Sequence, residues 1–513
     1  MYIYDCLYGK IEFEKKMYRC MLSPELQRLR EVRLGNINSL LLTGSANNNR
    51  FEHSVGTAYL AMVNIAANAS SFSKEYNDAF VYAALFHDLG NGPFGHSYEY
   101  IVQKQGFNPE QSVEDVIFGR LTGSHRRSVT CEPFYLGVPN ELSSILSRKE
   151  IEQIDKIVKG ENPFCSKILS SVIDIDNIDN VYRMAYHMGL RVNKRAPIEL
   201  AKGLICRNNT IFFKETAVPY LYDWYITRSN LYKLLLYNPQ DFSAKCMLSE
   251  LMENVLSRDR NVVRWQYTDA ELMSTFFKIN DEYWNENLLM PISLNEGLCE
   301  DDFADEDTTR EAMKRLGVDI PPRARVTICR GDGLVEICYY NTSFVFSKGS
   351  LFKKIKKVET NVPKLAERLM MGDLYGCIGI FVSGQISKCD LFLDVYQKNQ
   401  LEMECNYYIE KRIPGKNFQI CFHGIVDKNK TNRQIEVQLE TGEYFQIGEN
   451  THNLLIGAFV KNASFGLKKG DLASSRRKEL SREVRKYLLS KDIICEEHVL
   501  YSEVDSIESE NSR

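Results

Sequence analysis

Residues 81–99 read VYAALFHDLGNGPFGHSYE, and most of the prediction of fold and site starts from this stretch. Its first six residues are apolar and predict the end of a buried helix. His87 and Asp88 follow directly. Two such polar side chains at the end of a buried helix cost free energy unless an ion or a charged partner holds them. The pattern therefore favours a metal-binding role for this pair.

The loop LGNGPFG, residues 89–95, contains glycine and proline and predicts a turn into a second helix. His96 and Glu99 then lie about one helical turn apart, so both side chains can face the same cavity. A histidine and a carboxylate placed in this way can relay a proton. We expect them beside the metal site.

Two other segments supply further side chains of the same kind. RFEHSVGTAYLA, residues 50–61, contains His53, and VIDIDNIDNVYRMAYHMG, residues 172–189, contains Asp176. Two imidazoles with two carboxylates suit a divalent ion such as Mn, Mg, Fe, Co or Ni. Such a set leaves coordination positions open for water and a phosphate oxygen, as metal-assisted hydrolysis requires.

The alternative reading of these residues is structural. A single histidine on an apolar face is more often a core residue than a ligand, and Asp174, Asp176 and Asp179 could form an exposed acidic face. However, three of the eight histidines of the chain fall within 44 residues, from His53 to His96. Isoleucines also alternate with the three aspartates, so some of these carboxylates are expected near a core.

Composition sets the broad class of the protein. The 513 residues are 44% hydrophobic and 26% charged, which is enough for several globular domains. A net charge of −4 argues against extensive coating of nucleic acid. The 14 cysteines include no CxxC pair and are expected to be reduced. No signal pattern and no apolar run of 18 residues is present, so we expect no membrane span and a cytoplasmic location.

Along the chain we predict a mainly α core followed by a mixed α+β, strand-rich C-terminal region. The expected parts are a helical metal-dependent domain over 1–300, an acidic linker or loop over 301–321, a strand-rich regulatory or oligomerising domain over 322–460 with a helix near 362–369, a basic amphipathic helix region over 461–500 and a disordered tail over 501–513. In the basic helix Leu480, Val484 and Leu488 share one face, which favours packing over binding a partner helix or nucleic acid.

The ordered series H…HD…D, with its flanking residues, resembles the HD-domain phosphohydrolase superfamily. Within it the chain is most similar to the deoxynucleoside triphosphate triphosphohydrolases, the dGTPase-like and SAM-and-HD-domain-like family. The resemblance covers about residues 1–290. It rests on ELQRLREVRLG at 25–35, NNRFEHSVGTAYLA at 48–61, HDLGNGPFGHSYE at 87–99, VIDIDNIDNVYRMAYHMGL at 172–190 and TRSNL at 227–231.

The resemblance implies roles for individual residues. The metal ligands would be His53, His87, Asp88 and Asp176, with Asp174 in support. His96 and Glu99 would form the catalytic acid/base pair, in which Glu99 orients His96. The residues implied at the substrate are Arg50 and Arg228 on the phosphates, and Arg33, Asn177 and Asn180 nearby.

Four positions depart from the family pattern. Asn177 and Asn180 stand where the animal branch has a lysine and a tyrosine, Arg33 where a glutamine reads the sugar, and Pro109 near a family histidine. These changes weaken any transfer of sugar and base specificity. They also leave room for a substrate with fewer phosphates.

The family reaction splits a dNTP into deoxynucleoside and inorganic triphosphate. We predict this activity, with dGTP favoured, and control or depletion of the dNTP pool, with antiviral defence one consequence. The resemblance also implies a homo-oligomer, an allosteric nucleotide between subunits and a partner protein bound through the C-terminal region. The alternatives are another HD phosphohydrolase, acting on a nucleoside monophosphate, a cyclic nucleotide or an oligonucleotide end, and a nucleotide-sensing assembly component.

Overall fold

The computed structural model describes residues 1–35, 37, 48–69, 74–95, 98, 113–118, 142–256, 267–279, 288–294, 297–331, 334–339, 342–347, 350–355, 362–413, 418–464 and 474–498. His96, Glu99, Pro109 and the tail over 501–513 lie outside these residues. The chain forms two compact units, one of Met1–Phe276 with Ala366–Arg513 and one of Phe277–Leu365. None of the described helices is both long enough and apolar enough to span a membrane.

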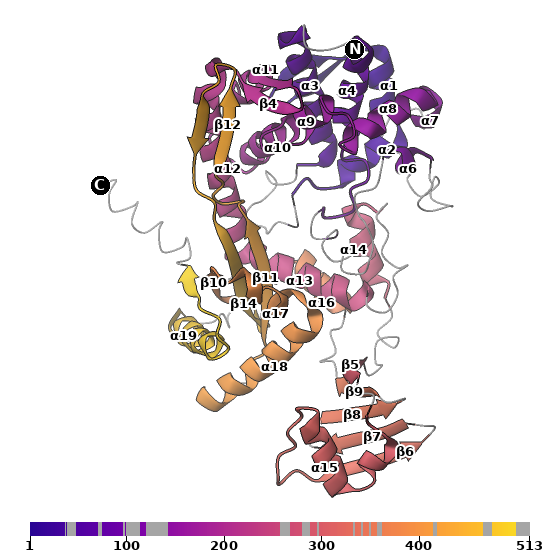
Figure 1. The fold of residues 1–513 in the computed structure, drawn as a ribbon, viewed down its shortest axis with the longest axis vertical. Coiled ribbons are helices and arrows are strands. Elements are labelled where there is room, and N and C mark those ends of the chain that lie inside the picture. The colour runs from indigo at the N-terminus through magenta and orange to yellow at the C-terminus, as the bar shows by residue number, and fades with distance from the viewer. Residues whose placement is uncertain are drawn as a thin grey trace, which may run out of the picture. The chain divides into compact units, whose positions relative to one another are not determined.

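The N-terminal part of the first unit is helical, as predicted (Figure 1). Short strands β1 (Tyr2–Asp5) and β2 (Gly9–Glu12) pair in an antiparallel hairpin before the helices begin. The helices are α1 (Lys15–Met21), α2 (Pro24–Gln27), η1 (Arg28–Glu31), α3 (Arg50–Ala67), α4 (Lys74–Phe86), α6 (Val113–Phe118), α7 (Leu142–Ile145), α8 (Arg148–Val158), α9 (Cys165–Leu169), α10 (Ile175–His187), α11 (Ala196–Gly203), η6 (Glu215–Ala217), α12 (Val218–Tyr237), α13 (Pro239–Leu256) and α14 (Asp269–Phe277).

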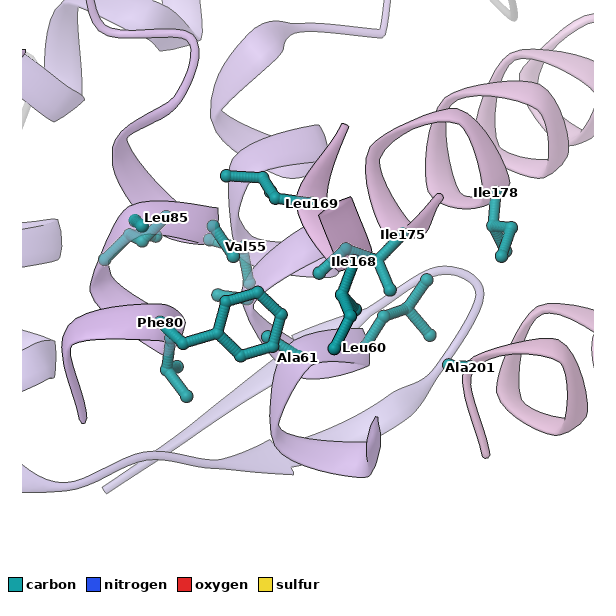
Figure 2. Close-up of a cluster of buried hydrophobic side chains, with 14 of the residues drawn as sticks. Val55, Leu60, Ala61, Phe80, Leu85, Ile168, Leu169, Ile175, Ile178 and Ala201 are labelled. Carbon is teal, nitrogen blue, oxygen red and sulfur yellow. The ribbon is translucent and has the colours of Figure 1, made fainter. Parts of the chain in front are cut away.

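One hydrophobic core holds these helices together. Phe80 and Leu85 of α4 lie near Val55 of α3, and Ile168, Ile175 and Ala201 come from α9, α10 and α11 (Figure 2). These six side chains are at most 2% exposed, so packing fixes the helices whose ends carry the predicted ligands.

The described C-terminal part of the first unit carries strands of two four-stranded sheets, four α-helices and one 3-10 helix. Its elements are α16 (Val362–Met370), β10 (Tyr375–Ser383), η9 (Ile386–Lys388), α17 (Asp390–Leu393), α18 (Val395–Arg412), β11 (Ile420–Lys428), β12 (Ile435–Leu439), β13 (Tyr444–Ile447), β14 (His452–Ser464), α19 (Ser474–Ser490) and β15 (Glu496–His498). The first sheet has the order β11-β14-β10-β15. The second has the order β13-β12-β4-β3, with β3 at Leu204–Arg207 and β4 at Thr210–Phe213.

The second sheet joins strands of the helical part, β3 and β4, to strands of the C-terminal part, β12 and β13. β12 pairs with β4 in parallel, and Gln438 is opposite Phe212. The first sheet packs on α13, where Ser243 Oγ donates to the carbonyl of Tyr375 in β10 at 2.9 Å. Helix α18 also contacts α13, since Lys398 pairs with Glu253 at 2.7 Å. The C-terminal region is therefore part of the same unit as the helical core.

The second unit is a five-stranded antiparallel sheet with one helix. Its order is β5-β9-β8-β7-β6, with β5 at Leu288–Leu294, β6 at Val326–Gly331, β7 at Leu334–Tyr339, β8 at Thr342–Ser347 and β9 at Ser350–Ile355. Helix α15 (Glu306–Arg315) follows η8 (Glu300–Phe303) and contacts β6. Phe303, Ala312 and Met313 are buried against the sheet.

The observed elements differ from the expected parts in two places. Residues 301–321, expected as a linker or loop, contain η8 and α15, because Asp305 caps the helix and one helical face is buried. The strands expected as one region over 322–460 are divided between the two units. The predicted helix near 362–369 is present as α16, and Leu480, Val484 and Leu488 of α19 are buried, which confirms the packing reading of the basic helix.

Candidate metal centre

Three helix termini bring four predicted ligands together. His53 lies in the first turn of α3, which Asn49 caps by accepting a hydrogen bond from the backbone N–H of Glu52 at 3.0 Å. His87 and Asp88 follow the last residue of α4. Asp176 lies in the first turn of α10, where Asp174 is the N-cap. Asp174 therefore fixes the start of the helix that carries Asp176, and its supporting role at a metal ion stays a prediction.

The ligand atoms lie within a narrow range of distances. His53 Nε2 is 3.0 Å from Asp176 Oδ1, and His87 Nε2 is 3.2 Å from His53 Nε2 and 3.6 Å from Asp176 Oδ1. The atoms of His53, His87 and Asp176 therefore form a group that could hold one ion, and Asp88 lies beside it, with Oδ1 3.7 Å from His87 Nε2 and the other oxygen, Oδ2, 3.8 Å from His53 Nε2. Ligands bound at about 2.1 Å to one ion lie about 3 to 4 Å apart. The spacing therefore fits one divalent ion.

The histidine tautomers give an independent test of this fit. His87 Nδ1 lies 2.8 Å from the carbonyl oxygen of Ala84, and His53 Nδ1 lies 2.8 Å from the carboxylate of Asp179. Both partners are acceptors, so both Nδ1 atoms carry the proton. In the neutral rings the two Nε2 lone pairs then face each other, which is favourable only with a cation between them. The donor set fits a divalent metal ion.

Asp179 and Arg183 orient His53 from behind. Asp179 is fully buried and accepts hydrogen bonds from Arg183 Nε at 2.8 Å and from the hydroxyl of Tyr8 at 2.7 Å. Arg183 also donates to Asp5 at 2.9 Å. The Asp179 carboxylate thus fixes the His53 ring and makes it a better electron donor to an ion.

The charges of the site depend on each other. Burial disfavours a charged His53, but hydrogen bonds and charge from Asp176 and Asp179 outweigh burial and raise the pKa of His53 to about 10. The pKa of His87 is raised by Asp88 and Asp176 against the same effect of burial. Burial works against ionisation of Asp176, yet the two imidazoles lower its pKa. Without a metal ion, the His53 ring therefore carries a proton beside the ionised carboxylates, where an ion would otherwise supply the positive charge.

The loop after Asp88 is held by three contacts. Asn91 donates to Asp88, and Arg28 Nη2 donates to the carbonyls of Leu89 and Asn91 at 3.0 and 2.8 Å. Gly95 has a φ of +50°, and a Cβ there would lie 2.6 Å from Arg50 Nη2. Glycine is required at this position because a side chain would be both strained and in contact with Arg50.

The predicted substrate arginines are engaged in other contacts. Arg50 Nη1 donates to Asp88 Oδ2 at 2.8 Å, so this arginine is paired with a predicted metal ligand. Arg228 Nη1 donates to the backbone carbonyls of Asn429 and Lys430 at 2.9 and 2.7 Å. Arg33 Nε lies 3.6 Å from Asp269. Contact of these three residues with phosphate or sugar stays a prediction.

One of the two predicted substrate asparagines carries a buried acceptor without a partner among the described residues. Asn177 and Asn180 both lie half-buried on α10, close in sequence to Asp176. Asn180 Oδ1 is a buried acceptor without a hydrogen-bond partner among the described residues. A buried polar atom of this kind usually has a water or ligand as its partner.

The sequence prediction missed several supporting residues. Asp269 accepts a hydrogen bond from the backbone N–H of Phe94 at 2.7 Å, which ties α14 to the loop before His96. Near Arg183, Cys6, Glu52 and His187 form a second group of ligand-type side chains, with Glu52 and His187 2.9 Å apart. No local pattern marks either group, because their partners come from distant parts of the chain.

The helices that carry the predicted ligands are similar to a known domain. The family model described as "HD domain" matches residues 50–184, the range that contains the four predicted ligands. Curated relatives of the chain include triphosphohydrolases at low identity. The chain is 27% identical over 262 residues to the Deoxynucleoside triphosphate triphosphohydrolase SAMHD1 of Xenopus laevis, covering 45% of this chain and 41% of that protein.

Other relatives support the same domain. The "Uncharacterized protein YwfO" of Bacillus subtilis is 24% identical over 243 residues, covering 47% of this chain and 52% of the relative. The chain thus spans about half the length of these curated relatives. Two solved structures share the fold over nearly the whole chain at 16% identity. A phosphohydrolase from Bacteroides thetaiotaomicron covers 90% of this chain and 99% of its own with a TM-score of 0.52, and a hypothetical protein from Aquifex aeolicus covers 94% and 99% with a TM-score of 0.55.

Proposed function

We propose that the chain is a metal-dependent deoxynucleoside triphosphate triphosphohydrolase. The observation that carries this proposal is the convergence of His53, His87, Asp88 and Asp176, with two Nε2 lone pairs directed at one point. The distant likeness to SAMHD1, whose name gives this reaction, supports the choice of substrate. A bound divalent ion would polarise a phosphoryl oxygen and lower the pKa of bound water.

The residues of the chain would have separate tasks in this reaction. Asp179 holds the His53 ring in one tautomer, and Arg50 holds Asp88 through a charge-assisted hydrogen bond at 2.8 Å. Both contacts keep the ligand atoms in place before substrate binds. His96 and Glu99 are assigned to proton transfer from their sequence alone, with Glu99 orienting His96.

The test is hydrolysis of single nucleotides. Purified protein is incubated with each dNTP and rNTP in Mn²⁺ or Mg²⁺, and the products are separated by ion-exchange chromatography. We expect deoxynucleoside and inorganic triphosphate, with dGTP the best substrate. Asp88→Asn should abolish the reaction, whereas Asp223→Asn should retain it, because Asp223 accepts a hydrogen bond from Tyr182 and is not in the ligand set.

The products also separate the proposal from its alternatives. Monophosphate or orthophosphate would assign the chain to another branch of HD phosphohydrolases. No turnover of any nucleotide, with metal bound, would contradict the proposal and favour a nucleotide-sensing role. Homo-oligomer formation, an allosteric nucleotide, a partner at the C-terminal region, action on the cytoplasmic dNTP pool and antiviral defence stay predictions that this assay does not address.

A further inference from the structure

A second group of metal-ligand side chains lies apart from the candidate metal centre, and we call it the Cys6 cluster. It consists of Cys6, Glu52 and His187, whose ligand atoms all lie within 4.8 Å of one another. His187 is the last residue of α10, whereas Asp176 lies in its first turn. At 1.5 Å per residue, the two positions are about 16 Å apart along the helix axis. The two groups of side chains are therefore distinct.

The turn that carries Cys6 is fixed by its neighbours. Cys6 follows β1 in the N-terminal hairpin, and Asp5 Oδ1 accepts hydrogen bonds from the backbone N–H groups of Leu7 and Tyr8 at 2.8 and 3.0 Å. The backbone carbonyl of Cys6 accepts a further hydrogen bond from Lys194 Nζ at 2.8 Å. These contacts hold the thiol in place beside the two helices that supply its neighbours.

The three ligand atoms converge on one point. His187 Nε2 lies 2.9 Å from Glu52 Oε2 and 3.5 Å from Cys6 Sγ. Zinc binds sulfur, nitrogen and oxygen ligands at about 2.0 to 2.3 Å, so neighbouring ligands of a tetrahedral ion lie about 3.3 to 3.6 Å apart. The distance between Cys6 and His187 falls within this range, and the shorter distance to Glu52 needs only a small outward shift of the carboxylate.

The approach of both partners to one nitrogen distinguishes the cluster from an activated cysteine nucleophile. In such a nucleophile, one ring nitrogen takes the thiol proton while a carboxylate or amide holds the other nitrogen. In the Cys6 cluster the thiol and the carboxylate of Glu52 both approach Nε2 of His187, which carries at most one proton. An ion between the three atoms uses all of them as ligands.

The charges around the cluster also favour a further cation. Arg183 Nη1 lies 3.6 Å from Cys6 Sγ and 3.7 Å from Glu52 Oε2. The shorter contacts of this guanidinium are with Asp179 at 2.8 Å and with Asp5 at 2.9 Å. Its single positive charge is therefore already matched by two carboxylates. The charge of Glu52, and that of a Cys6 thiolate, is left for another cation to balance.

We propose that Cys6, Glu52 and His187 form a second metal site, which binds Zn²⁺. Thiolate, imidazole and carboxylate are the side chains that bind zinc in proteins. The side chains of Glu52 and His187 are 36% and 20% exposed, so the ion enters from solvent and keeps a water as its fourth ligand. A bound ion would join the N-terminal hairpin to α3 and α10. The thiolate sets this site apart from the candidate metal centre, whose predicted ligands supply only nitrogen and oxygen.

The experiment is a titration of the full-length, reduced protein with Co²⁺, a spectroscopic substitute for zinc. A thiolate ligand gives Co²⁺ a charge-transfer band in the near ultraviolet that nitrogen and oxygen ligands do not give. We expect this band in the wild type, its disappearance when Zn²⁺ displaces Co²⁺, and its absence in Cys6→Ser. Asp88→Asn, changed in the candidate metal centre, should keep the band. Cys389→Ser, the matched control at another half-buried cysteine, should keep it as well.

A second variant separates loss of a ligand from loss of the fold. His187→Gln should weaken Co²⁺ binding, measured by the same band, about tenfold or more, since loss of even an outer partner of a ligand costs that much. Both variants without metal should keep the circular dichroism of the wild type. If Cys6→Ser misfolds, the wild-type band and the affinity of His187→Gln decide the question.

Three results would overturn the proposal of a zinc site. They are a wild type without the charge-transfer band, a band that persists in Cys6→Ser, and a band that is lost equally in Cys389→Ser or Asp88→Asn. Hydrolysis of nucleotides is not measured, so the outcome is independent of the triphosphohydrolase proposal.

Discussion

Metal binding to this site should release protons and should therefore strengthen as the pH rises. Hydrogen bonds with Asp176 and Asp179 raise the pKa of His53 to about 10 in spite of burial, so the metal-free ring is protonated at neutral pH. An ion that binds Nε2 must displace this proton. Each proton released changes the apparent affinity by about tenfold per pH unit, or about 1.4 kcal/mol.

The same shift makes the stability of the metal-free protein depend on pH. The pKa of His53 is higher in the folded protein than its ordinary value of 6.5, so protonation favours the folded state. This contribution is fully present below pH 6.5 and is lost as the pH rises toward 10. The shift corresponds to at most about 5 kcal/mol. We expect the melting temperature of metal-free protein to fall over this range, and saturating Mn²⁺ to reduce the fall.

The assay is titration calorimetry with Mn²⁺ at pH 6, 7 and 8, each in two buffers of different ionisation enthalpy. Wild type should release at least one proton per ion at pH 8. Asp179→Asn removes one of the two carboxylates that raise the pKa of His53, so it should release fewer protons at pH 8. Asp5→Asn is the matched control, since Asp5 also pairs with Arg183, at 2.9 Å, but has no contact with His53.

Three results would refute this reasoning. The first is an Mn²⁺ affinity of the wild type that does not change between pH 6 and 8. The second is equal proton release by wild type and Asp179→Asn. The third is an equal change in Asp5→Asn, because that would trace the effect to the charge of Arg183 and not to the ring of His53.

Two further predictions concern glycine geometry and the C-terminal core. Gly95→Ala should destabilise the protein and sharply reduce hydrolysis, because the new Cβ would lie 2.6 Å from Arg50 Nη2 and displace it. The control Gly160→Ala, with a φ of +84° and open space around it, should cost only about 1 kcal/mol and leave hydrolysis intact. Thermal melts and product assays check both variants, and full activity of Gly95→Ala would contradict the prediction. Leu480→Ala should lower the free energy of unfolding in urea by about 2 to 5 kcal/mol, because Leu480 is fully buried. The control Lys486→Ala, at an exposed position, should lower it by less than about 0.5 kcal/mol. Similar losses in the two variants would show that this face of α19 does not pack as the structure has it.

The sequence predicted those features of the site that depend on local pattern. An apolar run ending in His87-Asp88 is a local signal for a buried helix with ligands at its end, and the structure has α4 stop at Phe86. Isoleucines around Asp174 and Asp179 predicted carboxylates near a core, and both aspartates are at most 2% exposed. Such patterns can be recognised in a single sequence because helix periodicity determines which side chains share a face.

The features that the sequence did not predict depend on distant contacts. Asp179 was read as one of several acidic residues, and its hydrogen bond from Tyr8 needs the N-terminal hairpin, 171 residues away. The 18-residue helix α18 has little amphipathic pattern to mark it. The acidic stretch at 301–321 was read as a linker or loop, although an N-cap and three buried residues stabilise a helix there.

Helix α12 joins the helical core to the C-terminal region, and this has a consequence for tests of the site. The predicted metal ligands come from residues 50–184, the range that the family model matches. The loop that follows β11 comes from the C-terminal region and is docked on α12 by Arg228 and Ser229. Ser229 is not a predicted metal ligand, so Ser229→Ala should lower the melting temperature by the loss of one hydrogen bond, about 1 kcal/mol, while the affinity for Mn²⁺ stays the same. A loss of Mn²⁺ affinity in this variant would show that docking of the loop also holds the ligands in place.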